Sequence, residues 1–407
     1  MNRPAFLFAV FLSLAQLPAI SAHATDSGYR PLDEAARTAH RLYTQAGGVP
    51  AESSVGFLLA VDPARPDTAS IAAQLPSAMD PLAWLAREWM YRDRRAEAES
   101  LLSTPASAAQ AERIVLRAQL LLSAGRYAAA VTALEQAGRL SQPWAAYADY
   151  NRAAALERAG QHDAALQALD ALGRITPADP EVAALRDRAN ITLGFRQLVR
   201  NDAAAARAAF ERVRLDSPFS SGALLGMGWV EFSQGNLSRA LIPWSALRQR
   251  DAADPAVREV MLLVPYVQWR VGAHRDAVKS YRDTISGLDA ELVAVDRILA
   301  GLRNGAMLDN LLGEVPQRVG AILADGTLRA ALDTWQYLRI LEARAATLPQ
   351  PVRSSIARAN ADHRVWLQGR ITAALEAERQ RVDAQRARAH FELARLLDDV
   401  AARRGEP

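Results

Sequence analysis

Small and large apolar residues recur in a periodic order along this chain of 407 residues. The clearest example is GALLGMGWVEFSQGNLSRALIPW, at residues 222 to 244. The apolar spacing is also helical from Leu288 to Leu302 and from Leu328 to Leu348, on either side of a breaker-rich stretch from Gly305 to Gly326. The pattern therefore predicts an all-α chain.

The last part of the chain is predicted to form one long helix. Pro351 opens a run that has no further proline until Pro407, and its only glycine before Gly405 is Gly369. At the rise of an α-helix this run would reach about 80 Å if it were unbroken. A narrow apolar stripe along it predicts a seam that docks on another helix, although the stripe is too interrupted to establish a coiled coil. The stripe consists of Ile371, Leu375, Val382, Leu393, Leu396 and Val400.

Two neighbouring segments repeat the same order of small and large residues. Residues 188 to 210 match residues 222 to 244 at four pairs of positions, and the two members of each pair are 34 residues apart. In this period and pattern the chain resembles the tetratricopeptide repeat (TPR) family. The resemblance implies a solenoid of antiparallel helix pairs that cross at small residues, with an aromatic residue filling the gap beside them. The pairs are Gly194 with Gly228, Asn201 with Gly235, Ala206 with Ala240, and Phe210 with Trp244.

Further units extend this resemblance over roughly residues 80 to 285. Pro243 and Pro265 fall inside predicted helices and are expected to kink them. Residues 222 to 267 also look like a set of exported proteobacterial repeat proteins, a likeness that implies no particular activity. The turn and small-residue positions of the other units are Gly125 and Ala130, Gly160 and Ala165, Gly272 and Ala277, and, in a weaker unit from Trp84 to Leu102, Ala98.

The first 24 residues read as a secretory signal peptide. A short n-region with Arg3 precedes an apolar run from Ala5 to Ile20, and Ala22-His23-Ala24 is an A-x-A cleavage site. An uncleaved anchor is the alternative, but the apolar run is interrupted and shorter than the roughly 20 residues that a membrane span needs. We therefore expect cleavage after Ala24, a periplasmic location and no membrane span in the mature chain. The expected parts are a signal peptide at 1 to 24, a helical and loop lead-in at 25 to 80, a TPR-like array at 81 to 286 and a long-helix region at 287 to 407.

The composition and the absence of known motifs exclude several classes of protein and of functional site. The chain has no cysteine, which excludes a disulfide framework, and a net charge of only +3 without a basic block, which argues against nucleic-acid binding. No HExxH, GxSxG or glycine-rich phosphate loop occurs in the sequence. We therefore expect no catalytic residues, no metal site and no cofactor.

The candidate binding residues follow from the resemblance. In the TPR family, positions 2, 5, 9, 12 and 13 of each first helix face the concave groove. This register places on one strip Phe195, Trp229, Phe232, Tyr266 and Trp269, with Arg270 beside them, whereas it assigns Trp244 to the core. Aromatic residues of a groove are typical interface anchors. Two alternatives stay open: a protein partner occupies the strip, or the long C-terminal helix of the same chain covers it.

These features favour a non-enzymatic periplasmic scaffold or adaptor that binds a protein or peptide partner in the cell envelope through an aromatic groove. The alternative is a chaperone or a catalytic component that processes envelope polymers. A repeat fold serves many roles, so the sequence leaves the partner and the oligomeric state open.

Overall fold

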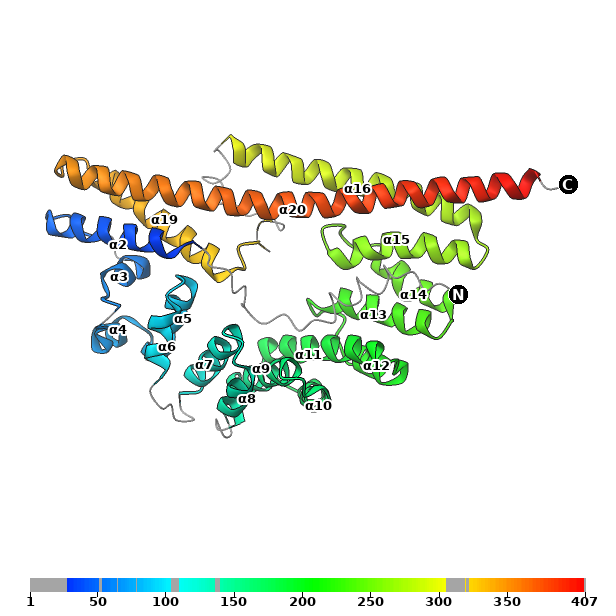
Figure 1. Ribbon diagram of the computed structural model, residues 1–407, viewed down its shortest axis with the longest axis horizontal. Helices are drawn as coiled ribbons and strands as arrows, with labels where there is room; N and C mark the ends of the chain where they lie inside the picture. Colours follow the sequence, from blue (N-terminus) through cyan, green and yellow to red (C-terminus); the bar gives the residue numbers. More distant parts are fainter. Residues whose placement is uncertain are drawn as a thin grey trace. The chain divides into compact units, whose positions relative to one another are not determined.

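The structure is a computed structural model whose described residues form 17 helices and contain no strand (Figure 1). This confirms the all-α prediction. The predicted signal peptide and most of the stretch from Gly305 to Gly326 lie outside the described residues. The described residues are 28–50, 53–63, 65–77, 79–103, 110–135, 140–304, 319 and 322–405.

The described chain divides into two compact units. Unit 1 comprises Asp149–Ala300 and Leu375–Pro407, and unit 2 comprises Ala19–Ala148 and Gly301–Ala374. Unit 1 holds α10 (His162–Gly173), α11 (Pro180–Val199), α12 (Ala203–Glu211), α13 (Ser220–Ser233), α14 (Leu237–Leu247) and α15 (Pro255–Arg270), with most of α9 (Trp144–Arg158) and α16 (His274–Arg303) and the last part of α20 (Gln350–Gly405). Unit 2 holds α2 (Arg30–Gln45), α3 (Ser54–Ala60), α4 (Thr68–Gln74), α5 (Pro81–Tyr91), α6 (Arg95–Leu102), α7 (Ala111–Ser123), α8 (Tyr127–Glu135), α19 (Gly326–Arg344) and the first part of α20.

Three helices that come first in their repeat pairs, α5, α11 and α15, begin in the same way, because an Asp-Pro dipeptide starts each of them. The aspartates at the N-caps of α5, α11 and α15 are Asp80, Asp179 and Asp254, and the side chain of each accepts a hydrogen bond from at least one backbone N–H group of the first turn. The proline that follows lacks an N–H group, which would have no partner inside the helix at this position. The dipeptide therefore fixes where each of these helices starts.

The turn that ends each first helix of unit 1 contains a residue in the left-handed conformation. Asn201, Gly235 and Gly272 have φ angles of 62°, 82° and 84°. Such a residue lets the chain fold back so that a later N–H group satisfies a carbonyl of the last helical turn. At the middle turn, Asn236 N–H donates to the Glu231 carbonyl at 3.0 Å. The predicted turn positions are thus confirmed.

The helices of each pair in unit 1 cross at small residues, as predicted. A methyl group added to Gly228 would lie 2.0 Å from Trp244 Nε1, and one added to Gly194 would lie 2.5 Å from the Phe210 ring. Ala240, on the second helix of its pair, is completely buried. Helices α14 and α15 both continue past their internal prolines.

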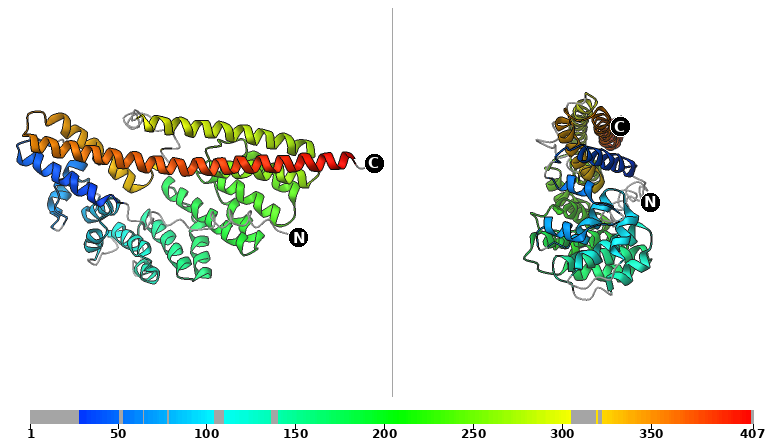
Figure 2. Two further views of the ribbon diagram at one scale, coloured as in Figure 1. Left: turned by 45° about the horizontal axis from the view of Figure 1, so that its top comes forward. Right: turned by 90° about the vertical axis from the view of Figure 1, so that its left-hand side faces the viewer.

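The end of α20 packs beside α16 in unit 1 (Figures 1 and 2). Four of its buried residues recur every seventh position, which places them on one side of the helix. Arg379 pairs with Asp296 at 2.6 Å and Arg386 with Asp289 at 3.1 Å, so the two helices run antiparallel. The predicted docking seam is therefore present. The four buried residues are Leu375, Val382, Ala389 and Leu396, of which Ala389 was not in the predicted stripe, and Leu393 and Val400 of that stripe are partly exposed.

Helix α16 changes one expectation about the chain's organisation. The second helix of the last pair continues without a break into the segment from Leu288 to Leu302, so that 30 residues form one helix. The expected boundary between residues 286 and 287 therefore lies inside an α-helix. The domain boundaries remain predictions.

Two of the apolar clusters in unit 2 join its N-terminal helices to one another and to α19 and α20. One joins α2, α3, α19 and α20 around residues that include Tyr43, Tyr337 and Ile356. The other lies around Trp89 and Ala98, between α5 and α6. The turn between these two helices has Asp93 in the left-handed conformation, with a φ angle of 59°, so the weaker predicted unit has the same helix pair as the others.

Candidate functional site

The predicted strip lies on α11, α13 and α15 of unit 1, but two of its rings are buried. Phe195 is 1% exposed and Trp229 is 5% exposed. Phe195 meets Phe210 edge-on at 5.1 Å between ring centroids, and Trp229 meets Trp244 in the same way at 5.3 Å. The exposure expected for Phe195 and Trp229 is therefore not found, because the aromatic residues of the second helices pack against them.

The other residues of the strip remain accessible. Phe232, Tyr266 and Trp269 are partly exposed and Arg270 is exposed. Arg270 Nη1 donates to the Tyr266 hydroxyl at 3.1 Å, and its guanidinium carbon lies 6.0 Å from the centre of the Tyr266 ring. These four side chains are the part of the predicted site that a partner could reach.

Helix α20 packs against the end of this strip and leaves Trp269 partly exposed. The rings of Trp269 and His274 lie 4.1 Å apart between centroids and are tilted by 53°, and Trp269 packs against a cluster that contains Ala389 and Leu396 of α20. The buried Arg258 of α15 forms an ion pair with Glu378 of α20. In unit 1 the C-terminal helix thus covers part of the last repeat, which is the intramolecular alternative expected from the sequence.

A carboxylic acid, Glu259, completes this surface. Trp229 Nε1 donates to Glu259 Oε1 at 3.1 Å and links α13 to α15. Burial raises the pKa of Glu259 to about 7, although the hydrogen bond from Trp229 acts in the opposite direction. Glu259 occupies position 2 of its first helix, one of the positions expected to face the concave groove, but the sequence analysis predicted no role for it. The neighbouring repeats have Arg188 and Gly222 at the same position, so the acidic residue was the feature of the sequence that could have drawn attention to it.

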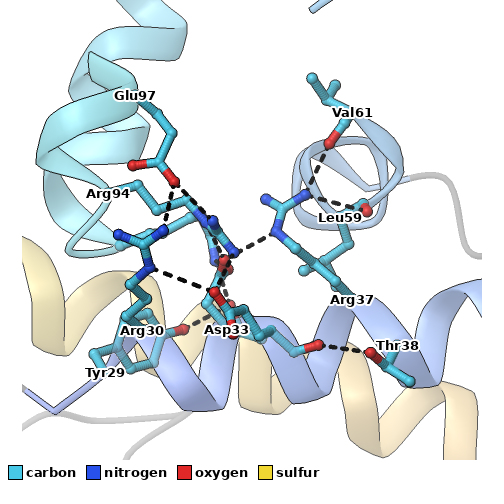
Figure 3. Close-up of polar contacts among 12 residues, drawn as sticks. Tyr29, Arg30, Asp33, Arg37, Thr38, Leu59, Val61, Arg94 and Glu97 are labelled. Carbon is cyan, nitrogen blue, oxygen red and sulfur yellow. Dashed lines mark hydrogen bonds and ion pairs between the residues drawn. The ribbon is translucent and has the colours of Figure 1, made fainter. Parts of the chain in front are cut away.

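A second polar cluster lies in unit 2, around a completely buried carboxylate, Asp33 (Figure 3). Arg94 Nε donates to Asp33 at 2.7 Å, Arg37 Nε at 2.9 Å and Arg92 Nη1 at 3.3 Å. Thr334 of α19 accepts from Arg92 at 2.8 Å. The cluster thereby joins α2, the turn between α5 and α6, and α19.

The chemistry of this cluster is that of a structural ion-pair network. Burial alone would raise the pKa of Asp33, but the guanidinium groups of Arg37, Arg92 and Arg94 outweigh it and hold that pKa below its usual value. Sequence reasoning missed the network. The available signal was a polar residue, Asp33, within the buried stripe of α2.

Within the described residues, no group of three or more metal-binding side chains comes together. The helices of that same part of the chain are too short or too polar to cross a membrane.

Comparison with known families supports the assignment of helical repeats. Residues 121–189 and residues 193–255 match two models of the tetratricopeptide repeat. The second segment contains Gly194 and Phe210, and Gly228 and Trp244, the glycine and aromatic residues that meet at the two helix crossings. The predicted repeat family is thus confirmed for this part of the chain. A search of curated proteins found no match to the sequence.

Proposed function

We propose that this tetratricopeptide repeat chain is a non-enzymatic adaptor that binds a protein partner through the inner face of α11, α13 and α15. Tetratricopeptide repeats typically serve as scaffolds for protein–protein interaction. The partner would lie along the accessible part of the strip, which consists of Phe232, Tyr266, Trp269 and Arg270.

One observation carries this proposal. The aromatic residues of the second helices in unit 1 are buried, as at Trp244, whereas Phe232 and Trp269, which share position 12 of successive first helices, remain partly exposed. Partly exposed aromatic rings at a constant register give a partner large apolar contacts at little cost in side-chain entropy.

The adaptor is proposed to act in the periplasm, as part of a cell-envelope assembly. This location is supported by the sequence of residues 1 to 24, with its apolar run and A-x-A site.

Site-specific photo-crosslinking in the cells that make the protein tests the proposed surface. A photoreactive phenylalanine derivative replaces Phe232 in one variant, Tyr266 in a second and Ile242 in a third. Ile242 is 71% exposed on α14, a second helix, and serves as the matched control. We expect the same crosslinked partner from positions 232 and 266 and none from position 242. Equal crosslinking from position 242, or none from the other two, would contradict the proposal.

A further inference from the structure

The partner's charge can be inferred from Glu259. This carboxylic acid is the acidic residue of the concave register in the three stacked first helices, and its side chain is mostly withdrawn from water. Trp229 holds it in place by a single hydrogen bond at 3.1 Å from a neutral donor. An ionised carboxylate is costly to bury unless a cation compensates for the lost hydration.

Arg258 and the two arginines of the concave register are engaged elsewhere. Arg258, the residue before Glu259, donates to the carbonyls of Ala252 and Ala253 and pairs with Glu378 of α20. The other two charged residues of the concave register contact tyrosines. The guanidinium carbon of Arg188 in α11 lies 5.2 Å from the centre of the Tyr150 ring, and Arg270 of α15 donates to the Tyr266 hydroxyl.

No ion pair involving Glu259 is found among the residues that the structure describes. The two influences on its pKa are burial and the indole hydrogen bond, and neither comes from a positive charge. An ionised Glu259 would therefore have no counter-ion among the described residues, and one cation from outside could neutralise its charge.

We propose that a lysine or arginine side chain of the partner binds at Glu259 and forms the missing ion pair. The inference rests on the proposed function, because it assigns the chemistry of the partner on that same face. Trp229 acts as a positioning residue that orients the carboxylate. Binding of the cation favours the ionised acid, so complex formation releases a proton wherever Glu259 is protonated in the free protein.

Short linear peptides from a displayed random library are the probe. They are selected on the full-length mature chain, and their affinities are measured by calorimetry on wild type, Glu259→Gln and Phe232→Ala. The side-chain amide oxygen that Glu259→Gln introduces can still accept the Trp229 hydrogen bond, so this variant retains the neutral form of the site and is expected to fold. Circular dichroism checks the folding of both variants.

We expect selected peptides to share one basic residue. Its replacement by norleucine weakens binding to wild type by about tenfold or more, which corresponds to about 1.4 kcal/mol, and leaves binding to Glu259→Gln unchanged. Wild-type affinity rises from about pH 5.5 to about pH 8, as the acid with a pKa of about 7 ionises, and the variant shows no such rise.

The outcomes separate this inference from the proposed function. If peptides lose affinity for Phe232→Ala but bind Glu259→Gln as tightly as wild type, the proposed binding face is supported. The proposal that a partner cation binds at Glu259 is then overturned. Peptides without a shared basic residue overturn it as well. A library that yields no binder, or only binders that depend on neither residue, overturns both proposals.

Discussion

At Asp33 the chain buries one carboxylate among three arginines. The side chain of Asp33 is fully buried, and those of Arg92 and Arg94 are 1% and 5% exposed. Such a network adds little stability compared with apolar packing, but the loss of a single member leaves uncompensated buried charges. The residue is therefore critical to unit 2 although it takes no part in the proposed binding face.

Replacing Asp33 by Asn is expected to cost about 3 to 5 kcal/mol of unfolding free energy, because three guanidinium groups then lack their shared counter-ion. Urea denaturation followed by circular dichroism measures the loss. Asp163→Asn is the control, since Asp163 is 80% exposed and pairs with Arg200 at the surface. A loss at Asp33 no larger than the loss at Asp163 would contradict the structural role of the network.

At the scale of the helices, the small residue at each crossing sets how closely two helices approach. Ala240 is completely buried in α14, whereas Ala246 of the same helix is exposed. Trp244, between them in sequence, donates from its indole nitrogen to the Leu225 carbonyl of α13 at 3.0 Å. The crossing is thus fixed by packing and by a buried hydrogen bond.

Ala240→Leu is expected to overpack this crossing and to lower stability by about 1 to 3 kcal/mol. Ala246→Leu adds the same atoms to the exposed side of α14 and should leave the melting temperature nearly unchanged. Thermal unfolding of the two variants gives the comparison. If both variants melt like wild type, the crossing does not lie at Ala240.

The sequence predicted the turns and helix crossings correctly, because local backbone geometry decides which residues can occupy them. Left-handed turn residues such as Gly235 and crossing residues such as Gly228 are required by the backbone itself, so they can be read from a period of 34 residues. The exposure of Trp229 could not be read in this way, because it depends on how Trp244 and Phe232 pack around it. The Asp33 network brings α2 to Thr334, about three hundred residues away, and no local pattern specifies that contact.

At the scale of the whole molecule, a fall and a rise in pH act on two different groups, the buried His363 and the partly buried Glu259. Burial lowers the pKa of His363, which donates from Nδ1 to the Ala359 carbonyl at 2.8 Å, so the folded state favours the neutral ring. The opposite holds for Glu259, whose raised pKa means that the folded state favours the protonated acid. His363 belongs to unit 2 and Glu259 to unit 1.

Two variants separate these effects when each is compared with wild type across pH. For His363, the unfolded state binds the proton more readily, so wild type loses stability relative to His363→Leu as pH falls below about 6.5. For Glu259, the folded state holds the proton between about pH 4.5 and about pH 7, so wild type loses stability relative to Glu259→Gln as pH rises through that range. Differential scanning calorimetry from about pH 5 to about pH 8 measures both differences. Because the other titrating groups are common to wild type and variant, they cancel in each difference. If both stability differences changed with pH in the same direction, one of the two groups would not have the pKa shift described for it.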